Sequence, residues 1–216
     1  MNKTLKFLGS DAGFGRENNS AYIEIENKLI LIDCGFTVFE KVIDNFNLNS
    51  YDDIEIIITH LHNDHAGSLS QIILYAYSIC NKKVRVISGC EHIDEYLSFC
   101  GTPKDAYELV TETDNITMIK TEHTPYLDAY GFQMLINGKN IIYTGDTNTF
   151  NPFLPYINEA DELYIDVSKS GGVHIKIEDI YEKLKQIKSN GTDIYLMHID
   201  DKKYVADYIN GEFELA

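Results

Sequence analysis

The stretch Thr59-His60-Leu61-His62-Asn63-Asp64-His65 places three imidazoles and one carboxylate close together in the chain. It follows Ile54-Glu55-Ile56-Ile57-Ile58, whose length and β-branched residues predict a buried strand. The strand delivers the cluster to the end of a sheet, and imidazole nitrogen and carboxylate oxygen are ligands of zinc and similar metals. Four such groups in one turn cannot readily close around a single ion. The pattern therefore predicts two adjacent metal ions, with later loops completing each shell.

The second half of the chain supplies suitable groups. His123 follows a strand predicted at 116–120, and Asp146 and His198 also come just after predicted strands, as His60 does in the first half. An isolated histidine after a strand is usually a hydrogen-bonded structural residue. Four strand ends that carry His or Asp form a pattern, and we interpret them as one site.

The arrangement of predicted elements favours an α/β fold with two similar halves. Each half places strand-like segments before helices, and Asn137-Gly138 predicts a two-residue hairpin. Packed sheets with helices outside give a four-layer αββα sandwich, and the lack of a linker predicts a single domain over 1–216. The strands are predicted at 3–8, 20–26, 28–33, 54–59, 84–88, 116–120, 129–136, 139–144, 162–167 and 193–198, and the helices at 37–47, 67–80, 91–99, 176–189 and 201–209.

Composition restricts the partners. The 216 residues include 44% hydrophobic and 24% charged residues, ordinary values for a soluble protein. The chain has no apolar run of the roughly 18–20 residues that a membrane span needs, and no signal peptide is recognisable, so we expect a cytoplasmic protein without a membrane partner. The net charge of -16 disfavours long nucleic acids. It does not disfavour a small anion, because bound metal ions bring their own positive charge.

The four cysteines form no C-x-x-C pair, which argues against a thiolate zinc site or a redox pair. We expect buried free thiols. They are Cys34, Cys80, Cys90 and Cys100.

The histidine-rich stretch, extended through Ala66-Gly67, resembles the H-x-H-x-D-H motif of the metallo-β-lactamase fold superfamily. Leu31-Ile32-Asp33-Cys34-Gly35 is similar to the strand and turn that precede this motif. Three later segments resemble the remaining motifs in the same order, so the resemblance spans nearly the whole chain. These segments are Glu122-His123-Thr124, Tyr143-Thr144-Gly145-Asp146-Thr147 and Leu196-Met197-His198-Ile199.

The resemblance implies a metal-dependent hydrolase with a dinuclear centre. It assigns His60, His62 and His123 to one metal, Asp64, His65 and His198 to the second, and Asp146 to both. Nitrogen and oxygen ligands suit Zn²⁺ best and permit Mn²⁺ or Fe. A hydroxide between the two metals is the expected nucleophile, and Asp64 is expected to orient it.

Further segments resemble the ribonuclease Z-like phosphodiesterase branch. They are Phe7-Leu8-Gly9-Ser10, Asn18-Asn19-Ser20-Ala21-Tyr22 and Asp128-Ala129-Tyr130-Gly131-Phe132. The resemblance implies that His174, just before the helix predicted at 176–189, assists phosphodiester cleavage by neutralising a phosphate oxygen or protonating the leaving alkoxide. Without this resemblance, His174 would be interpreted as a polar residue at a helix start.

The chain departs from that branch at two points. Asp166 lies where the branch usually carries glutamate, and its shorter side chain leaves open whether it partners His174 or a metal ligand. No Gly- and Lys-rich insertion resembles the tRNA-gripping arm of ribonuclease Z. We therefore expect a small phosphodiester substrate such as a cyclic nucleotide. Relatives in the branch are often homodimers, so a homodimer is expected by resemblance alone.

Two alternatives stay open. An acyl hydrolase (a thioesterase, lactonase or β-lactamase) would use the same metal pair but would not need His174. A binding or sensor protein that had lost its metals would need no turnover at all. For Tyr126 and Phe14, we expect packing, with contact to a substrate base as the alternative.

Overall fold

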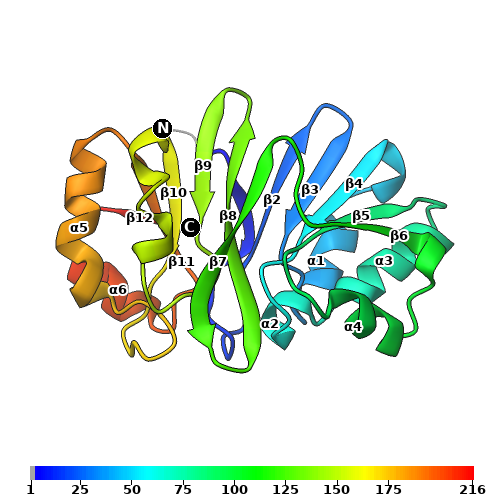
Figure 1. Cartoon of the computed structure of the whole chain (residues 1–216), viewed down its shortest axis with the longest axis horizontal. Coiled ribbons are helices and arrows are strands. Elements are labelled where there is room, and N and C mark those ends of the chain that lie inside the picture. Colours follow the sequence, from blue (N-terminus) through cyan, green and yellow to red (C-terminus); the bar gives the residue numbers. More distant parts are fainter. Residues whose placement is uncertain (1–2) are drawn as a thin grey trace.

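The computed structural model describes residues 3–216 and contains two six-stranded sheets (Figure 1). The first sheet has the order β1 (Lys6–Gly9), β2 (Ser20–Ile25), β3 (Lys28–Ile32), β4 (Asp53–Ile57), β5 (Val84–Ile87) and β6 (Tyr107–Val110). The second has the order β12 (Glu214–Leu215), β11 (Asp193–Met197), β10 (Glu162–Asp166), β9 (Lys139–Tyr143), β8 (Leu127–Ile136) and β7 (Ile116–Thr124).

The two sheets follow the same pairing pattern, which gives the fold its two similar halves. Strands β1 to β3 pair antiparallel and β3 to β6 pair parallel. In the second sheet, β7 to β9 pair antiparallel and β9 to β12 pair parallel. Parallel neighbours bring their carboxyl ends to one edge of a sheet, where residues that follow them can meet.

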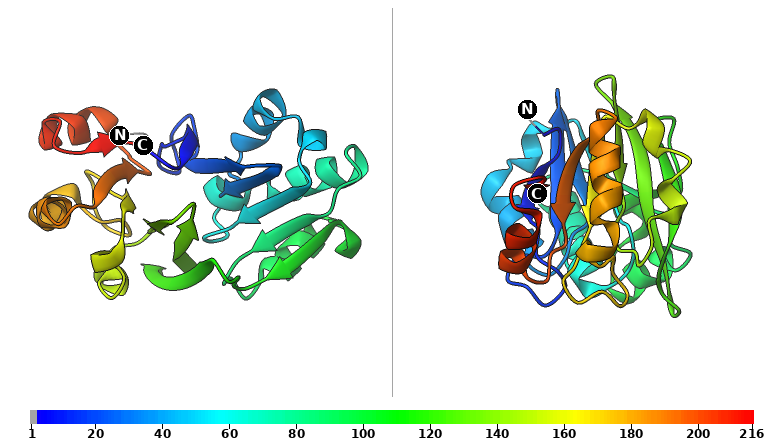
Figure 2. Two further views of the ribbon diagram at one scale, coloured as in Figure 1. Left: turned by 90° about the horizontal axis from the view of Figure 1, so that it is seen from above. Right: turned by 90° about the vertical axis from the view of Figure 1, so that its left-hand side faces the viewer.

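Helices cover both outer faces of the sheet pair, as Figure 2 shows in two orientations. The first sheet carries α1 (Val38–Asn45), α3 (Leu69–Ser78) and α4 (Ile93–Phe99), and the second carries α5 (Ile177–Ser189) and α6 (Lys202–Ile209). The predicted four-layer αββα sandwich is therefore confirmed. Short α2 (Asn63–Ala66) and the 3-10 turns η1 (Leu48–Ser50), η2 (Lys104–Ala106), η3 (Asn151–Phe153) and η4 (Ile157–Glu159) complete the chain.

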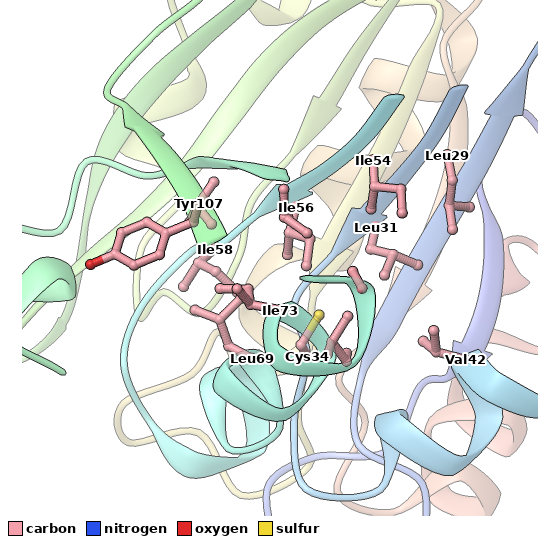
Figure 3. Packing of buried hydrophobic residues seen from close by; sticks show 14 of the residues in the cluster. Leu29, Leu31, Cys34, Val42, Ile54, Ile56, Ile58, Leu69, Ile73 and Tyr107 are labelled. Carbon is pink, nitrogen blue, oxygen red and sulfur yellow. The ribbon is translucent and has the colours of Figure 1, made fainter. Parts of the chain in front are cut away.

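Three buried hydrophobic clusters hold the layers together. One lies between the first sheet and its helices, where Ile56 and Ile58 pack with Leu69 and Ile73 (Figure 3). A second lies between the other sheet and α5 and α6. The third fills the space between the two sheets. Strand residues thus point alternately into an outer and an inner core, which explains the near-continuous apolar runs in the sequence.

The Asn137-Gly138 hairpin is confirmed, since both residues have positive φ (50° and 76°) and β8 pairs directly with β9. The predicted end of the strand at 120 is wrong, because β7 continues to Thr124 through an irregularity in its pairing with β8. The short strands β6 and β12 were not predicted. Each has at most four residues, too few for a periodic signal.

The cysteines are free within the described residues, and three of the four are buried. The prediction of a buried thiol is wrong for Cys100, which lies exposed just after α4. Among residues 3–216, no helix is long and apolar enough to cross a membrane.

A buried carboxylate ties the start of the chain to the second sheet. Glu162 accepts hydrogen bonds from Thr4 and Tyr164 and pairs with Lys139. Burial opposes its charge, but these donors outweigh burial and lower the pKa of Glu162. A carboxyl whose pKa is depressed on folding stabilises the protein above its unfolded pKa, and this contribution is lost as the pH falls through the folded pKa.

Glu162→Gln is therefore expected to reduce the free energy of unfolding at neutral pH by about 1–3 kcal/mol, because it removes a charged acceptor from buried and partly buried donors. Urea unfolding at several pH values would measure this difference. It should shrink as the pH falls below the ordinary glutamate range, where the wild-type carboxyl is also protonated. A difference that is constant across the acidic range would contradict the role assigned to the charge.

Candidate metal centre

The residues predicted to bind metal meet at one end of the sandwich. His60 follows β4, Asp146 follows β9 and His198 follows β11, while His123 lies within β7 near the tip of the β7–β8 hairpin. Figure 1 shows α2, which carries Asp64 and His65, at the same end as that tip. An isolated bridge between His60 and Ala129 of β8 joins the first sheet to the hairpin. Segments of both halves therefore build one site.

Three imidazoles form the first group of converging donors. His60 Nε2 lies 2.9 Å from His62 Nδ1, which lies 3.2 Å from His123 Nε2. His60 is fully buried, and His62 borders solvent. Three nitrogens at such separations can share one ion at about 2.0–2.1 Å from each. The group matches the set predicted for the first metal.

The second group combines imidazoles and carboxylates. His65 Nε2 lies 3.3 Å from His198 Nε2, and Asp64 Oδ2 lies 3.2 Å and 3.3 Å from these two nitrogens. Asp146 Oδ1 lies 3.4 Å from His65 Nε2. The set again matches the one predicted for the second metal, and Asp146 supplies a side chain to it.

Asp146 also faces the first group. Its Oδ2 lies 3.7 Å from both His60 Nε2 and His123 Nε2, and 3.5 Å from His198 Nε2. Its buried Oδ1 has no hydrogen-bond partner among the described residues. Because an unpaired buried carboxylate oxygen is costly, a cation is the partner that this atom fits. The His/Asp clusters therefore suit a divalent metal centre.

A layer of hydrogen bonds fixes which ring nitrogen faces the centre. His65 Nδ1 lies 2.8 Å from Asp33 Oδ2, and His123 Nδ1 lies 3.0 Å from the Val173 carbonyl oxygen. Thr59 Oγ1 lies 3.1 Å from His60 Nδ1 and 2.9 Å from Asp33 Oδ2. These partners hold the Nδ1 sides, which leaves the three Nε2 atoms free to act as ligands.

Backbone geometry brings Asp64 and His198 into place. An added Cβ at Gly35 would lie 2.0 Å from the Asp64 carbonyl oxygen, so only glycine permits this approach of the chain to α2. His198 has a φ of 54°, which is uncommon for a residue other than glycine. Asn19 Oδ1 accepts a hydrogen bond from His198 N and helps hold this conformation. Backbone strain of this kind is concentrated at functional sites.

The two groups differ in protonation. Burial and the neighbouring rings lower the pKa values of His60 and His62, which favours neutral imidazoles. Burial also opposes charge on His65 and His198, but the surrounding carboxylates, Asp146 foremost, outweigh it and raise both pKa values. A cation at the second group would take the place of these protons, since metal binding and protonation compete for the same nitrogen.

His174 stands beside both groups. Its Nδ1 lies 2.8 Å from Asp166 Oδ2 and 3.9 Å from Asp146 Oδ2, and its ring centroid is 5.2 Å from that of His123. Burial opposes a charge on His174, but Asp166 outweighs burial and raises the pKa of His174. The shorter carboxylate therefore does reach His174. Asp166 Oδ1 also lies 3.5 Å from His198 Nδ1, so one side chain contacts both histidines.

A cavity of about 690 Å³ opens beside His123. Tyr126 lines it from the hairpin tip and is 93% exposed, and Phe14 on the loop before β2 is 108% exposed. The prediction that these two aromatic residues pack against the protein is wrong. Both residues lie in turns, from which their side chains extend into solvent.

Sequence reasoning did not identify Asp33 as a partner of His65. The sequence does place Asp33 in the turn after an apolar strand, and in the structure this residue has a φ of 58°. The sequence alone does not show that its carboxylate contacts the His65 ring. Asp166 was noted without a firm partner.

Asp33→Asn is expected to weaken metal binding by about 10–100-fold, because the amide cannot supply the charge that holds the His65 ring. Asparagine tolerates positive φ, so the backbone should persist. Competition with a chromogenic chelator would measure the affinity. Asp44→Asn, on the exposed part of α1, removes one carboxylate far from the centre and serves as the control. Equal affinities in the two variants would contradict the role of Asp33.

Comparisons with known proteins agree with this geometry. A curated anti-Pycsar protein Apyc1 from Bacillus phage 010DV004 is 24% identical over 91% of this chain and 89% of its own length. The solved metallo-β-lactamase fold protein YhfI of Bacillus subtilis superposes with a TM-score of 0.75 at 19% identity, over 98% of this chain and 94% of its own. Human tRNase Z, short form, gives a TM-score of 0.73 at 16% identity, over 98% and 95%.

The predicted metallo-β-lactamase fold is thus confirmed. A sequence profile described as anti-Pycsar protein Apyc1 matches residues 3–95 and 87–216. Because this match takes in both halves and every side chain of the candidate metal centre, the chain belongs to the anti-Pycsar protein Apyc1 family.

Proposed function

We propose that this chain is a dinuclear metal-dependent phosphodiesterase that acts on a small phosphodiester such as a cyclic nucleotide. The observation that carries the proposal is the position of His174 beside the seven converging ligands, with Nδ1 3.9 Å from Asp146 Oδ2. An acyl hydrolase would need the ligands but not this ring. A leaving alkoxide needs a proton, and a histidine next to the metals can supply it.

The seven proposed ligands are divided between two ions. His60, His62 and His123 would hold one ion, Asp64, His65 and His198 the other, and Asp146 both. When bound, two divalent ions supply an activated water and positive charge for the phosphate oxygens. Zn²⁺ suits these donors best, with Mn²⁺ or Fe as alternatives. Asp64 is only half buried, so it borders the solvent from which water enters and can orient that water.

His174 has a defined part in the bond cleavage. Asp166 Oδ2 accepts a hydrogen bond from Nδ1 of His174, which leaves the Nε2 proton for the substrate. As the water oxygen bonds to phosphorus, the bond from phosphorus to the ester oxygen breaks. Nε2 delivers its proton to the departing alkoxide, and the attacking water releases one proton to solvent. The raised pKa of His174 keeps this proton available near neutral pH.

Several observations support a small substrate. The cavity of about 690 Å³ is of the size that holds a small molecule. The net charge of -16 opposes binding along a polyanion, and the sequence has no Lys-rich insertion that could grip one. Human tRNase Z, a ribonuclease by its name, shares the fold, so the fold is compatible with phosphodiester chemistry.

The test is hydrolysis of bis-p-nitrophenyl phosphate and of cyclic mononucleotides by the protein loaded with Zn²⁺ or Mn²⁺. We expect turnover of both substrates and its loss on chelation. If neither is hydrolysed by protein that retains its metal, the phosphodiesterase proposal is wrong. Light scattering on the same sample would test the predicted homodimer.

A further inference from the structure

The cavity beside His123, called here the hairpin groove, runs between the β7–β8 hairpin and the turn before α4. Two of its lining residues connect it to the metal centre: His123 itself and Leu61, which lies between two ligands. A substrate whose phosphate contacts the centre can therefore extend into the groove. The lining residues are Leu61, Cys90, Glu91, His92, the hairpin from Lys120 to Asp128, and Asn148.

The charges of the groove are unbalanced. Three carboxylates line it, Glu91, Glu122 and Asp128. Lys120 is the one Lys or Arg among these lining residues, and its Nζ lies 2.7 Å from Asp128 Oδ1. This ammonium is engaged within the protein, so no Lys or Arg of the lining is free to bind a phosphate, and His92 and His123 are the remaining basic residues there. Glu91 and Glu122 are both exposed and add negative potential along its wall.

The groove also offers groups that suit an uncharged ring. Asn148 N donates to the Glu122 carbonyl oxygen at 2.7 Å, which fixes Asn148 two residues beyond Asp146 with its exposed carboxamide at the groove. Leu61 and Pro125 add apolar surface. An amide that donates and accepts, next to apolar contacts, matches the hydrogen-bonding edge and the flat face of a nucleobase.

We propose that the hairpin groove holds the nucleoside part of the substrate and that Glu91 and Glu122 restrict the enzyme to substrates with a single negative charge. This inference rests on the phosphodiesterase function proposed above. The metals proposed for the centre would neutralise one phosphate. A second phosphate on the nucleoside would lie beside these two carboxylates, and the like charges would repel one another.

The test uses two chromogenic substrates that differ by one phosphate: the p-nitrophenyl ester of thymidine 5′-phosphate, and the same ester with a 3′-phosphate. At low ionic strength, we expect wild-type kcat/KM to favour the first by about tenfold or more. Glu122→Lys and Glu91→Lys should each reduce this preference by about threefold to tenfold, and added salt should reduce it in the wild type. Glu159→Lys makes the same charge change on η4, outside the groove, and should leave it unchanged.

Hydrolysis of bis-p-nitrophenyl phosphate distinguishes failure of the phosphodiesterase function from failure of the inference about the groove. If this ester is not hydrolysed, the phosphodiesterase function fails and the groove inference fails with it. If it is hydrolysed but neither thymidine ester is, or if wild type shows no preference, or if Glu159→Lys acts as strongly as Glu122→Lys, the groove inference alone is overturned. Glu122→Gln keeps the side-chain shape and should give a smaller change in the same direction, which covers the case of a poorly folded lysine variant.

Discussion

Asp146→Asn is expected to reduce phosphodiester hydrolysis by about 10³-fold or more and to lower the metal content of the protein, because this carboxylate is proposed to hold both metals. Its Oδ1 lies 3.4 Å from His65 Nε2, and its Oδ2 lies 3.7 Å from His60 Nε2. Each of the other six proposed ligands would bind one ion, whereas loss of the Asp146 charge would weaken the binding of both ions. An amide keeps the size of the side chain, so the loss should not come from unfolding.

Elemental analysis of protein purified without chelator would measure metal per chain, and a thermal melt of metal-free protein would check folding. Asp44→Asn should keep full activity and metal. If Asp146→Asn retains both, the carboxylate does not join the two groups. If the wild type holds fewer than about one metal per chain and added Zn²⁺ does not restore it, the chain is the metal-free binding protein left open as an alternative.

The sequence predicted the fold well because its signals are local. The apolar run before His60, the Asn137-Gly138 turn and the alternation of strands and helices each depend on neighbours in the chain, and the structure contains the corresponding elements. The grouping of the candidate ligands was predicted by resemblance, and the structure brings the same side chains into two groups. The metal roles of these residues remain proposals.

What the sequence could not supply depends on contacts between distant segments. Asp33 and His65 are 32 positions apart, and Asp166 touches both His174 and His198 across separate loops. The hairpin groove likewise combines the part of β7 beyond residue 120, which was not predicted, with residues from separate segments of the chain. Local patterns carry no information on which carboxylate faces which ring, so these contacts are apparent only in the folded structure.

His174→Ala is expected to lower kcat on cyclic nucleotides by about 10²–10⁴-fold without changing the metal content. The ring belongs to neither of the two groups proposed to hold the metals. It converges with Asp146, Asp166 and His198, but its Nδ1 is engaged by Asp166. The loss should be much smaller on bis-p-nitrophenyl phosphate, because p-nitrophenolate is stable enough to leave without a proton. This contrast distinguishes a proton donor from a residue that only binds the phosphate, which both substrates share.

Asp166→Asn provides the matched comparison, since it leaves the His174 ring in place and removes the charge that raises its pKa. The variant should show the same dependence on the leaving group as His174→Ala, but to a smaller degree. An equal loss on both substrates would show that His174 binds phosphate and donates no proton. If His174→Ala leaves phosphodiester turnover intact while Asp146→Asn abolishes it, the ring has no part in the reaction, and the acyl hydrolase alternative, which needs only the metal pair, becomes the better account of the site.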